Sequence, residues 1–319
     1  MASGMRTAWE RELIGVRANL SADPESAHDA ARRLLRRAKY NSERVRATLT
    51  MGWADWCGGR PELLKGALEN AARYRRPGDL AASDFAVHYA AYLNRSGDLN
   101  GALCSAGTAV DLSRPLARSA PEIRGTWKSG SVVRSVVNRA AYAASLTMRA
   151  QARFILSNRA ALYDAFEALN WADPRYVPHV HVAAVSAAGI TLLASGAATP
   201  ERCSEALRLA AHADRLLARR RVRATSPHRA KIEALRATAF ALLGSDELAE
   251  NLLTRAIKNL KSDGHEKDAA ILAEHFIRIL TSRGAQEGRA RLLASKYGIA
   301  LPRPKKRAAG PDDDDPIGF

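Results

Sequence analysis

The stretch WCGGRPELLKGALENAARYRRP at 56–77 returns in altered form as LNRSGDLNGALCSAGTAVDLSRP at 93–115. Gly59 corresponds to Gly97 and Ala71 to Ala109, and both pairs are separated by the same 38 residues. The stretch FALLGSDELAENLLTRAIKNL at 240–260 has the same order of a glycine followed by spaced alanines. A unit of this length that recurs along a chain is typical of stacked helical hairpins. The sequence therefore predicts a helical-repeat architecture.

Helical periodicity extends from these stretches over most of the chain. Apolar and alanine positions recur at spacings of three and four residues, and short segments with Gly, Pro, Ser or Asp separate them. The pattern predicts an all-α fold, with a helical-repeat domain over 1–300 and about fourteen helices in antiparallel hairpins. We expect these helices at 9–20, 27–38, 45–57, 63–74, 84–94, 99–112, 132–156, 160–171, 180–194, 202–218, 230–243, 247–260, 268–281 and 285–296.

Two of the repeats resemble the tetratricopeptide repeat (TPR), a helical hairpin with small residues at fixed positions and a glycine at its turn. The residues that carry the resemblance are Ala90, Leu93, Gly97, Ala102 and Ala109, and then Ala237, Phe240, Gly244, Ala249 and Ala256. The Trp and Leu of the family's first helix are mostly missing, repeat lengths vary, and 116–130 is an extra segment. The resemblance implies a right-handed TPR-like α-solenoid, not a regular array.

The charge of the chain is strongly positive. Lys and Arg number 49 against 33 Asp and Glu, which gives a formal net charge of +16 at pH 7. Such a surface attracts polyanions such as nucleic acid. Of the cations 39 are Arg and 10 are Lys. Arginine binds phosphate through paired donors and stacks on bases. A GC-rich genome also favours arginine codons, so both explanations of the arginine excess stay open.

Three groups of basic residues are the candidate nucleic-acid-binding sites, because clustered cations are the electrostatic footprint of such a site. Solvated helix faces are the alternative, and for the second group so is the favourable interaction of cations with a helix C-terminus. The first group contains Arg32, Arg33, Arg36, Arg37, Lys39, Tyr40 and Arg44. The second contains Arg219, Arg220, Arg221, Arg223, Arg229 and Lys231. The third contains Arg134, Arg139, Arg149 and Arg153.

Aromatic side chains on which bases could stack complete a single-strand binding surface. Tyr40 lies between two groups of arginines at an expected turn, so it is the favoured stacking residue. Tyr92 is a further candidate. Trp53, Trp56 and Tyr89 fall on TPR-like core positions, for which packing is the expected role.

The C-terminal residues differ in character from the rest. The proline-rich basic stretch 301–311 predicts a flexible linker. The final residues resemble the acidic, Phe-ending tip of the bacterial single-stranded DNA-binding proteins (SSB), although Pro316 and Gly318 depart from that tip. The matching residues are Asp312, Asp313, Asp314, Asp315, Ile317 and Phe319. The resemblance implies that 312–319 docks replication, recombination and repair enzymes and competes with nucleic acid for the basic surface. An acidic solubility tail is the alternative.

Several other classes of protein are not indicated. The chain has no phosphate-binding GxxxxGK[ST] loop and no GxGxxG, HExxH or GxSxG motif, so we expect neither an enzyme nor a cofactor. The three cysteines, Cys57, Cys104 and Cys203, form no CxxC pair, so we expect reduced thiols and no metal site. We find no signal peptide and no membrane span, which predicts a cytoplasmic protein of a bacterium or, if phage-encoded, of its host.

Three hypotheses for function follow. The first is a non-enzymatic single-stranded DNA-binding protein with a partner-docking tip, acting in DNA replication, recombination or repair. The second is a TPR-type interaction scaffold whose groove binds an acidic peptide or partner protein. The third is an RNA-binding helical-repeat protein.

Overall fold

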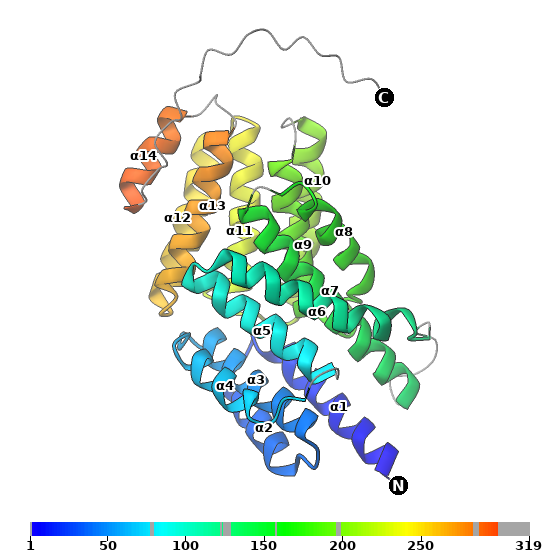
Figure 1. Cartoon of the computed structure of the whole chain (residues 1–319). Coiled ribbons are helices and arrows are strands. Elements are labelled where there is room, and N and C mark those ends of the chain that lie inside the picture. Colours follow the sequence, from blue (N-terminus) through cyan, green and yellow to red (C-terminus); the bar gives the residue numbers. More distant parts are fainter. Residues whose placement is uncertain are drawn as a thin grey trace.

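A computed structural model describes residues 2–76, 80–121, 123, 129–156, 158–195, 199–282 and 287–298. This described part contains fourteen α-helices and no β-strand (Figure 1), which confirms the prediction of an all-α, solenoid-like fold. The predicted linker 301–311 and tip 312–319 lie outside it. The helices are α1 (Ala2–Asn19), α2 (Pro24–Arg37), α3 (Asn41–Cys57), α4 (Leu63–Ala72), α5 (Leu80–Ser96), α6 (Leu99–Arg118), α7 (Gly130–Ile155), α8 (Ala161–Trp171), α9 (Pro178–Ala194), α10 (Pro200–Arg219), α11 (Pro227–Leu242), α12 (Asp246–Ser262), α13 (Glu266–Ser282) and α14 (Glu287–Tyr297).

Local chemistry sets where several of these helices begin. The Asp23 carboxylate accepts a hydrogen bond from the Ser26 amide at 3.1 Å, and the Asp98 carboxylate accepts one from the Gly101 amide at 2.9 Å. Both contacts satisfy backbone donors that the first turn of a helix leaves unpaired. Proline is the first residue of α2, α9, α10 and α11, where its missing N–H costs nothing.

The turn glycines confirm the repeat pattern. Gly59, Gly97 and Gly244, which the sequence aligns, have φ of 81°, 88° and 80°. This left-handed conformation is strained for any residue with a Cβ, and it reverses the chain between the two helices of a hairpin. Helix α6 differs from the expected end at 112 because it continues through Pro115 to Arg118. Burial of Ser113 and Ala117 in the packed structure and a hydrogen bond from Asn138 to the Leu116 carbonyl hold this last turn in place.

Small residues allow the helices to approach closely. A Cβ on Gly52 of α3 would lie 2.4 Å from Cβ of Ala67 in α4, and one on Gly189 of α9 would lie 2.5 Å from Leu235 in α11. The repeat alanines Ala71, Ala109 and Ala256 are fully buried. Larger residues at these places would force the hairpins apart, so the sequence's high alanine content is a packing requirement.

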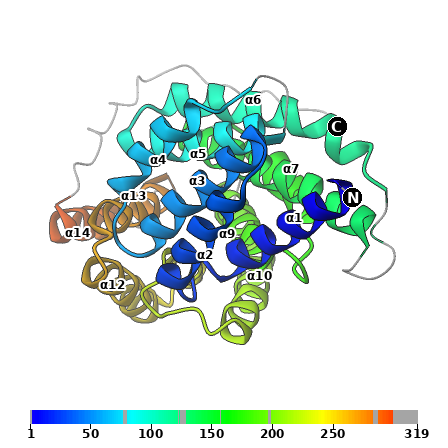
Figure 2. The same cartoon turned by 90° about the horizontal axis from the view of Figure 1, so that it is seen from below.

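The odd-numbered helices form the inner layer of the stack. From α3 to α13 each odd-numbered helix contacts the next odd-numbered one, while the even-numbered helices pack beside them. Seen from below, α6, α10 and α12 lie toward the periphery and α9 nearer the middle (Figure 2). Helix α1 contacts α7 and α9 as well as its neighbour α2, so the N-terminal helix lies across the curved inner surface.

The curvature brings the end of α3 against the turn between α12 and α13, about two hundred residues later in the sequence. A Cβ on Gly59 would lie 2.0 Å from the Asp263 carbonyl oxygen. Arg223 donates to the Cys57 carbonyl at 3.0 Å and pairs with the Asp263 carboxylate at 3.2 Å. Arg95 of α5 pairs with Asp268 of α13 at 3.1 Å. These contacts close the inner layer into a ring.

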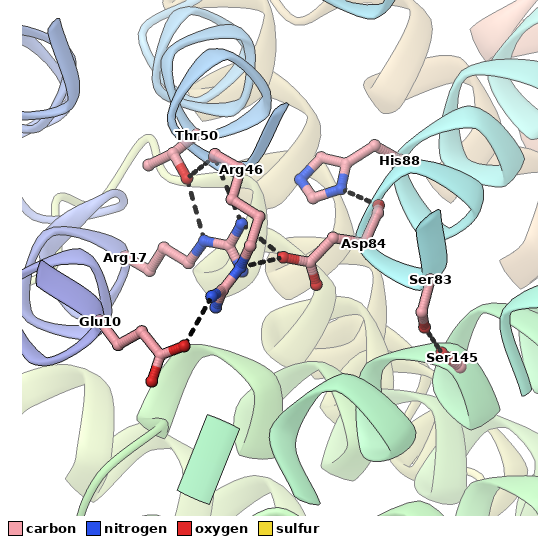
Figure 3. A network of polar contacts seen from close by, with 8 residues as sticks. All are labelled: Glu10, Arg17, Arg46, Thr50, Ser83, Asp84, His88 and Ser145. Atoms are coloured by element: carbon pink, nitrogen blue, oxygen red, sulfur yellow. Dashed lines mark hydrogen bonds and ion pairs between the residues drawn. The ribbon is translucent and has the colours of Figure 1, made fainter. Parts of the chain in front are cut away.

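A buried carboxylate fixes α5 within this ring (Figure 3). Oδ2 of Asp84 lies 3.0 Å from Nη2 of Arg17 in α1 and 3.0 Å from Nε of Arg46 in α3. Arg17 also donates to Oγ1 of Thr50 at 2.9 Å. Burial alone would raise the pKa of Asp84, but Arg17 and Arg46 outweigh it and hold this pKa at about 2. Three helices are therefore joined at one charged centre.

The closure contact can be tested at Gly59. Gly59→Ala and Gly97→Ala both place a Cβ at positive φ, which costs about 1–2 kcal/mol. The new Cβ at position 59 would collide with the backbone at Asp263, whereas nothing lies within 4 Å of a Cβ at position 97. We expect Gly59→Ala to lower the free energy of unfolding by about 1–3 kcal/mol more than Gly97→Ala in urea denaturation. Equal losses would contradict the closure.

The Asp84 centre predicts a pH dependence of stability. Asp84→Asn removes the carboxylate that Arg17 and Arg46 share and leaves Arg46 only Glu10, at 3.8 Å, so we expect a loss of about 3–5 kcal/mol in unfolding free energy at pH 7. Because the pKa of Asp84 in the folded protein lies near 2, below its ordinary 3.8, its contribution is present above about pH 4. The difference between parent and variant should narrow as pH falls from 4 to 2. Asp29→Asn on the exposed face of α2 is the control, and an unchanged difference would refute the assignment.

Candidate functional site

The first predicted basic group lies on the outer face of α2. Ala27, Ala31 and Leu34 of this helix are buried, so the side chains between them point outward. Arg37 pairs with Glu12 of α1. All six predicted residues from α2 and the turn that follows are exposed: Arg32, Arg33, Arg36, Arg37, Lys39 and Tyr40.

The surface continues from α2 into α3 and the end of α4. Tyr40 is 46% exposed immediately before α3. The buried Glu43 carboxylate accepts the Lys39 backbone amide at 2.8 Å, which orders this turn. One turn later the guanidinium of Arg44 lies over the ring of Tyr74, 5.5 Å from its centroid. Such a contact keeps the cation's edge available to a further acceptor.

An aromatic ladder on α5 lies next to the end of the α4 segment. Phe85, Tyr89 and Tyr92 follow one another at the i, i+4 and i+7 positions of one helix stripe. Their ring centroids are 6.0 and 6.4 Å apart, with interplanar angles of 24° and 16°. The guanidinium of Arg75, from the end of the α4 segment, lies 4.7 Å from the Phe85 centroid. Tyr89 is 40% exposed, so the ladder reaches the surface.

We name this surface the arginine–aromatic strip. It joins four consecutive contributions, from the end of α2, the start of α3, the end of α4 and one stripe of α5, all in the lower half of Figure 1. Its cationic members are Arg36, Arg37, Lys39, Arg44, Arg73, Arg75 and Arg76, of which Arg37 is paired with Glu12. Its exposed rings are Tyr40 and Tyr89, while Tyr74 and Tyr92 are partly buried and Phe85 is a buried ring beneath them.

The residues of the second predicted basic group, at 219–231, lie in different environments. Arg219, Arg220 and Arg221 are exposed at the end of α10, and Arg221 has a positive φ of 52°. Arg223 takes part in the ring closure, and Arg229 donates to the Val222 carbonyl at 3.2 Å. The Lys231 side chain lines a cavity at the centre of the ring.

The third predicted group, on α7, is mostly engaged with α8. Arg149 and Arg153 both pair with the buried carboxylate of Asp164, each at 2.7 Å. Arg139 lies over the Trp171 ring, 4.8 Å from its centroid, while Arg134 is exposed. The structure thus does not join the three groups into one surface. These α7 pairings stabilise a hairpin and occupy the guanidinium groups.

The aromatic candidates also divide. Trp53 and Trp56 stack on one another with centroids 4.5 Å apart and line the central cavity, as expected for packing residues. Tyr89, for which packing was also expected, is 40% exposed and is the part of the ladder that reaches the surface. Sequence reasoning missed Tyr74, Arg75 and Phe85. The signal that could have found them is the 85, 89, 92 spacing next to the run of arginines at 73–76.

Metal-binding and membrane-spanning features are not found in the same part of the chain. Within the described ranges, no three His, Cys, Asp or Glu side chains gather in a way that could hold a metal ion. None of the described helices has the length and apolar character needed to cross a bilayer. The predicted tip residues Asp312–Asp315, Ile317 and Phe319 lie outside the described residues.

Comparison with known families finds no family model that matches the chain, and comparison with curated proteins finds no significant match. The site must therefore be interpreted from its own geometry.

Proposed function

We propose that the protein is a non-enzymatic nucleic-acid-binding protein that holds single-stranded DNA on the arginine–aromatic strip. The observation that carries the proposal is the exposed ring of Tyr89, stacked between the buried ring of Phe85 and the partly buried ring of Tyr92, with Arg75 over the Phe85 ring. Proteins that bind single strands without sequence preference combine aromatic platforms for the bases with cations along the backbone. The strip supplies both on neighbouring elements, since Arg44 of α3 lies over Tyr74 and Arg75 lies over Phe85 of α5.

Each part of the strip has a distinct role. The exposed rings of Tyr89 and Tyr40 offer faces on which unpaired bases stack. Guanidinium groups along the strip bind phosphates and release counterions, so affinity falls as salt rises. Bases in a duplex already stack on one another, so the strip favours single strands over double strands. Because no base edge needs to be read, binding is independent of sequence.

The acidic tip belongs to the same proposal. We infer that 312–319 competes with DNA for the strip, because four aspartates on an eleven-residue linker form a tethered phosphate mimic at roughly millimolar concentration. Phe319 is a candidate anchor for replication, recombination or repair enzymes. A tip peptide with a photoreactive group, compared with its Phe319→Ala form, tests this docking role. The absence of Phe319-dependent capture of such enzymes would refute it.

The role of Tyr89 as a stacking platform can be tested by substitution. We expect Tyr89→Ala to weaken binding of a thymidine 30-mer about fivefold to a hundredfold, because one base loses its platform. Fluorescence anisotropy at two salt concentrations measures this affinity. The matched control is Tyr163→Ala, since Tyr163 on α8 is 81% exposed and lies outside the strip.

Three results would contradict or redirect this proposal. Equal affinities of the parent and of Tyr89→Ala would refute the strip as the binding surface. An RNA 30-mer that outcompetes DNA would select RNA as the ligand. Absence of oligonucleotide binding, together with tight binding of an acidic peptide, would select a protein-interaction scaffold.

Removal of the tip should strengthen DNA binding. The truncated chain 1–311 lacks the tethered competitor, so we expect its affinity for the same oligomer to rise roughly threefold to tenfold at low salt. The gain should shrink at higher salt, where the tip and DNA both bind more weakly. Replacing Asp312–Asp315 by Asn in the full chain should reproduce the gain. Unchanged affinity in both forms would show that the tip does not compete.

A further inference from the structure

A cavity of about 260 Å³ lies at the centre of the ring, and every odd-numbered helix from α1 to α13 contributes to its wall. The closure between α3 and the α12–α13 turn completes this wall. The cavity lies on the inner face of α5, whereas the ladder of the arginine–aromatic strip follows a different stripe of that helix. The two sites are therefore distinct.

Most of the wall is apolar. The stacked pair Trp53 and Trp56 forms one part of it, with His88 edge-on to Trp53 at 5.3 Å. Aliphatic and sulfur-containing side chains from α7, α9 and α13 form another part: Val137, Ala144, Met148, Val180, Ile190 and Ile271. A surface of this kind accepts an apolar body that gains by leaving water.

One cation in this wall lacks a counter-charge of its own. No hydrogen bond or ion pair among the described residues involves the Lys231 ammonium. Asp268 is the carboxylate that attracts it, but Oδ2 of Asp268 already lies 3.1 Å from Arg95 and 3.1 Å from His265. Burial lowers the pKa of Lys231, which Asp268 partly opposes. A partly buried ammonium without a counter-charge of its own attracts an anion from outside.

Positive charges also outnumber negative charges around the cavity, even though Arg46 pairs with Glu10, which lies outside the lining, at 3.8 Å. Its lining contains four cationic side chains, Arg17, Arg46, Arg95 and Lys231, and two carboxylates, Asp84 and Asp268. The lining histidines do not add charge at neutral pH, because burial lowers their pKa values to about 4 for His88 and His275 and about 3 for His179 and His228. An anionic ligand would reduce the excess of positive charge.

We propose that the central cavity is a binding site for a small apolar carboxylic acid, whose carboxylate pairs with Lys231 while its body packs against the apolar wall. This inference is independent of DNA binding. A cavity of roughly 150 Å³ holds benzene, so 260 Å³ corresponds to a ligand of about ten non-hydrogen atoms. Octanoate has this size, and octanamide is its neutral analogue of the same shape.

Calorimetric titration of the full chain with octanoate and octanamide tests the proposal. We expect octanoate to bind at least about tenfold more tightly, because a charge-assisted hydrogen bond forms only with the acid. Lys231→Met keeps the volume and removes the charge, so its preference for the acid should fall to within about twofold. Lys258→Met, at an exposed position on α12, should keep the parent's preference.

A second variant tests the proposal even if Lys231→Met does not fold. Ala144→Phe fills part of the cavity and should abolish binding of both compounds. Tyr89→Ala should leave octanoate binding unchanged, which separates this site from the strip. The proposal is overturned if the parent does not bind octanoate, if octanoate and octanamide bind it equally, or if a folded Lys231→Met variant keeps the parent's preference.

Discussion

The paired contact of Asp84 with Arg17 and Arg46 is the interaction on which the candidate sites depend. It ties α1 and α3 to α5 through one buried carboxylate. Helix α5 presents different residues to its two sides, with His88 and Arg95 at the central cavity and Tyr89 and Tyr92 on the strip. A shift of α5 would therefore disturb both surfaces. Because an unpaired buried charge is far more costly than a paired one, the three helices keep a single arrangement.

The closure of the ring imposes a second constraint. An open helical-repeat stack presents its inner helices as a groove, whereas contacts from Gly59, Arg223 and Arg95 to the α12–α13 region turn this groove into a cavity. A cavity of about 260 Å³ has room for a small molecule, whereas a nucleic-acid strand needs the larger outer surfaces. This division is the physical reason for assigning DNA to the arginine–aromatic strip and a small acid to the cavity.

Local features of the fold were predictable from the sequence. The periodic alanines and turn glycines predicted the positions of all fourteen helices. Both features depend on the backbone and packing within a single hairpin, so they can be recognised in the sequence. The end of α6 was not predicted correctly, because Pro115 lies in a last turn that contacts with α7 retain. The closure also escaped prediction, since residues near 59 and 264 meet only after several hairpins have set the curvature of the stack.

The candidate site was predictable only in part. A run of arginines indicates charge, but it does not tell which guanidinium finds a carboxylate in the folded chain. Arg149 and Arg153 have the same four-residue spacing as Arg32 and Arg36, yet the former pair with Asp164 while the latter are exposed. Lys231 was grouped with surface cations although it lines the cavity. Conversely, Tyr74 and Arg75 were not recognised as site residues from the sequence, because folding places Arg44 over Tyr74 and Arg75 over Phe85.

The central claim is that single-stranded DNA lies along the arginine–aromatic strip. Photo-crosslinking of the full chain to a bromouracil-substituted single-stranded oligomer, followed by peptide mapping, tests this claim most directly. We predict crosslinks concentrated in peptides that contain Tyr40, Tyr74, Tyr89 and Tyr92, and their loss at high salt. Crosslinks confined to α7, α8 or the end of α10, or none at any salt concentration, would contradict the claim.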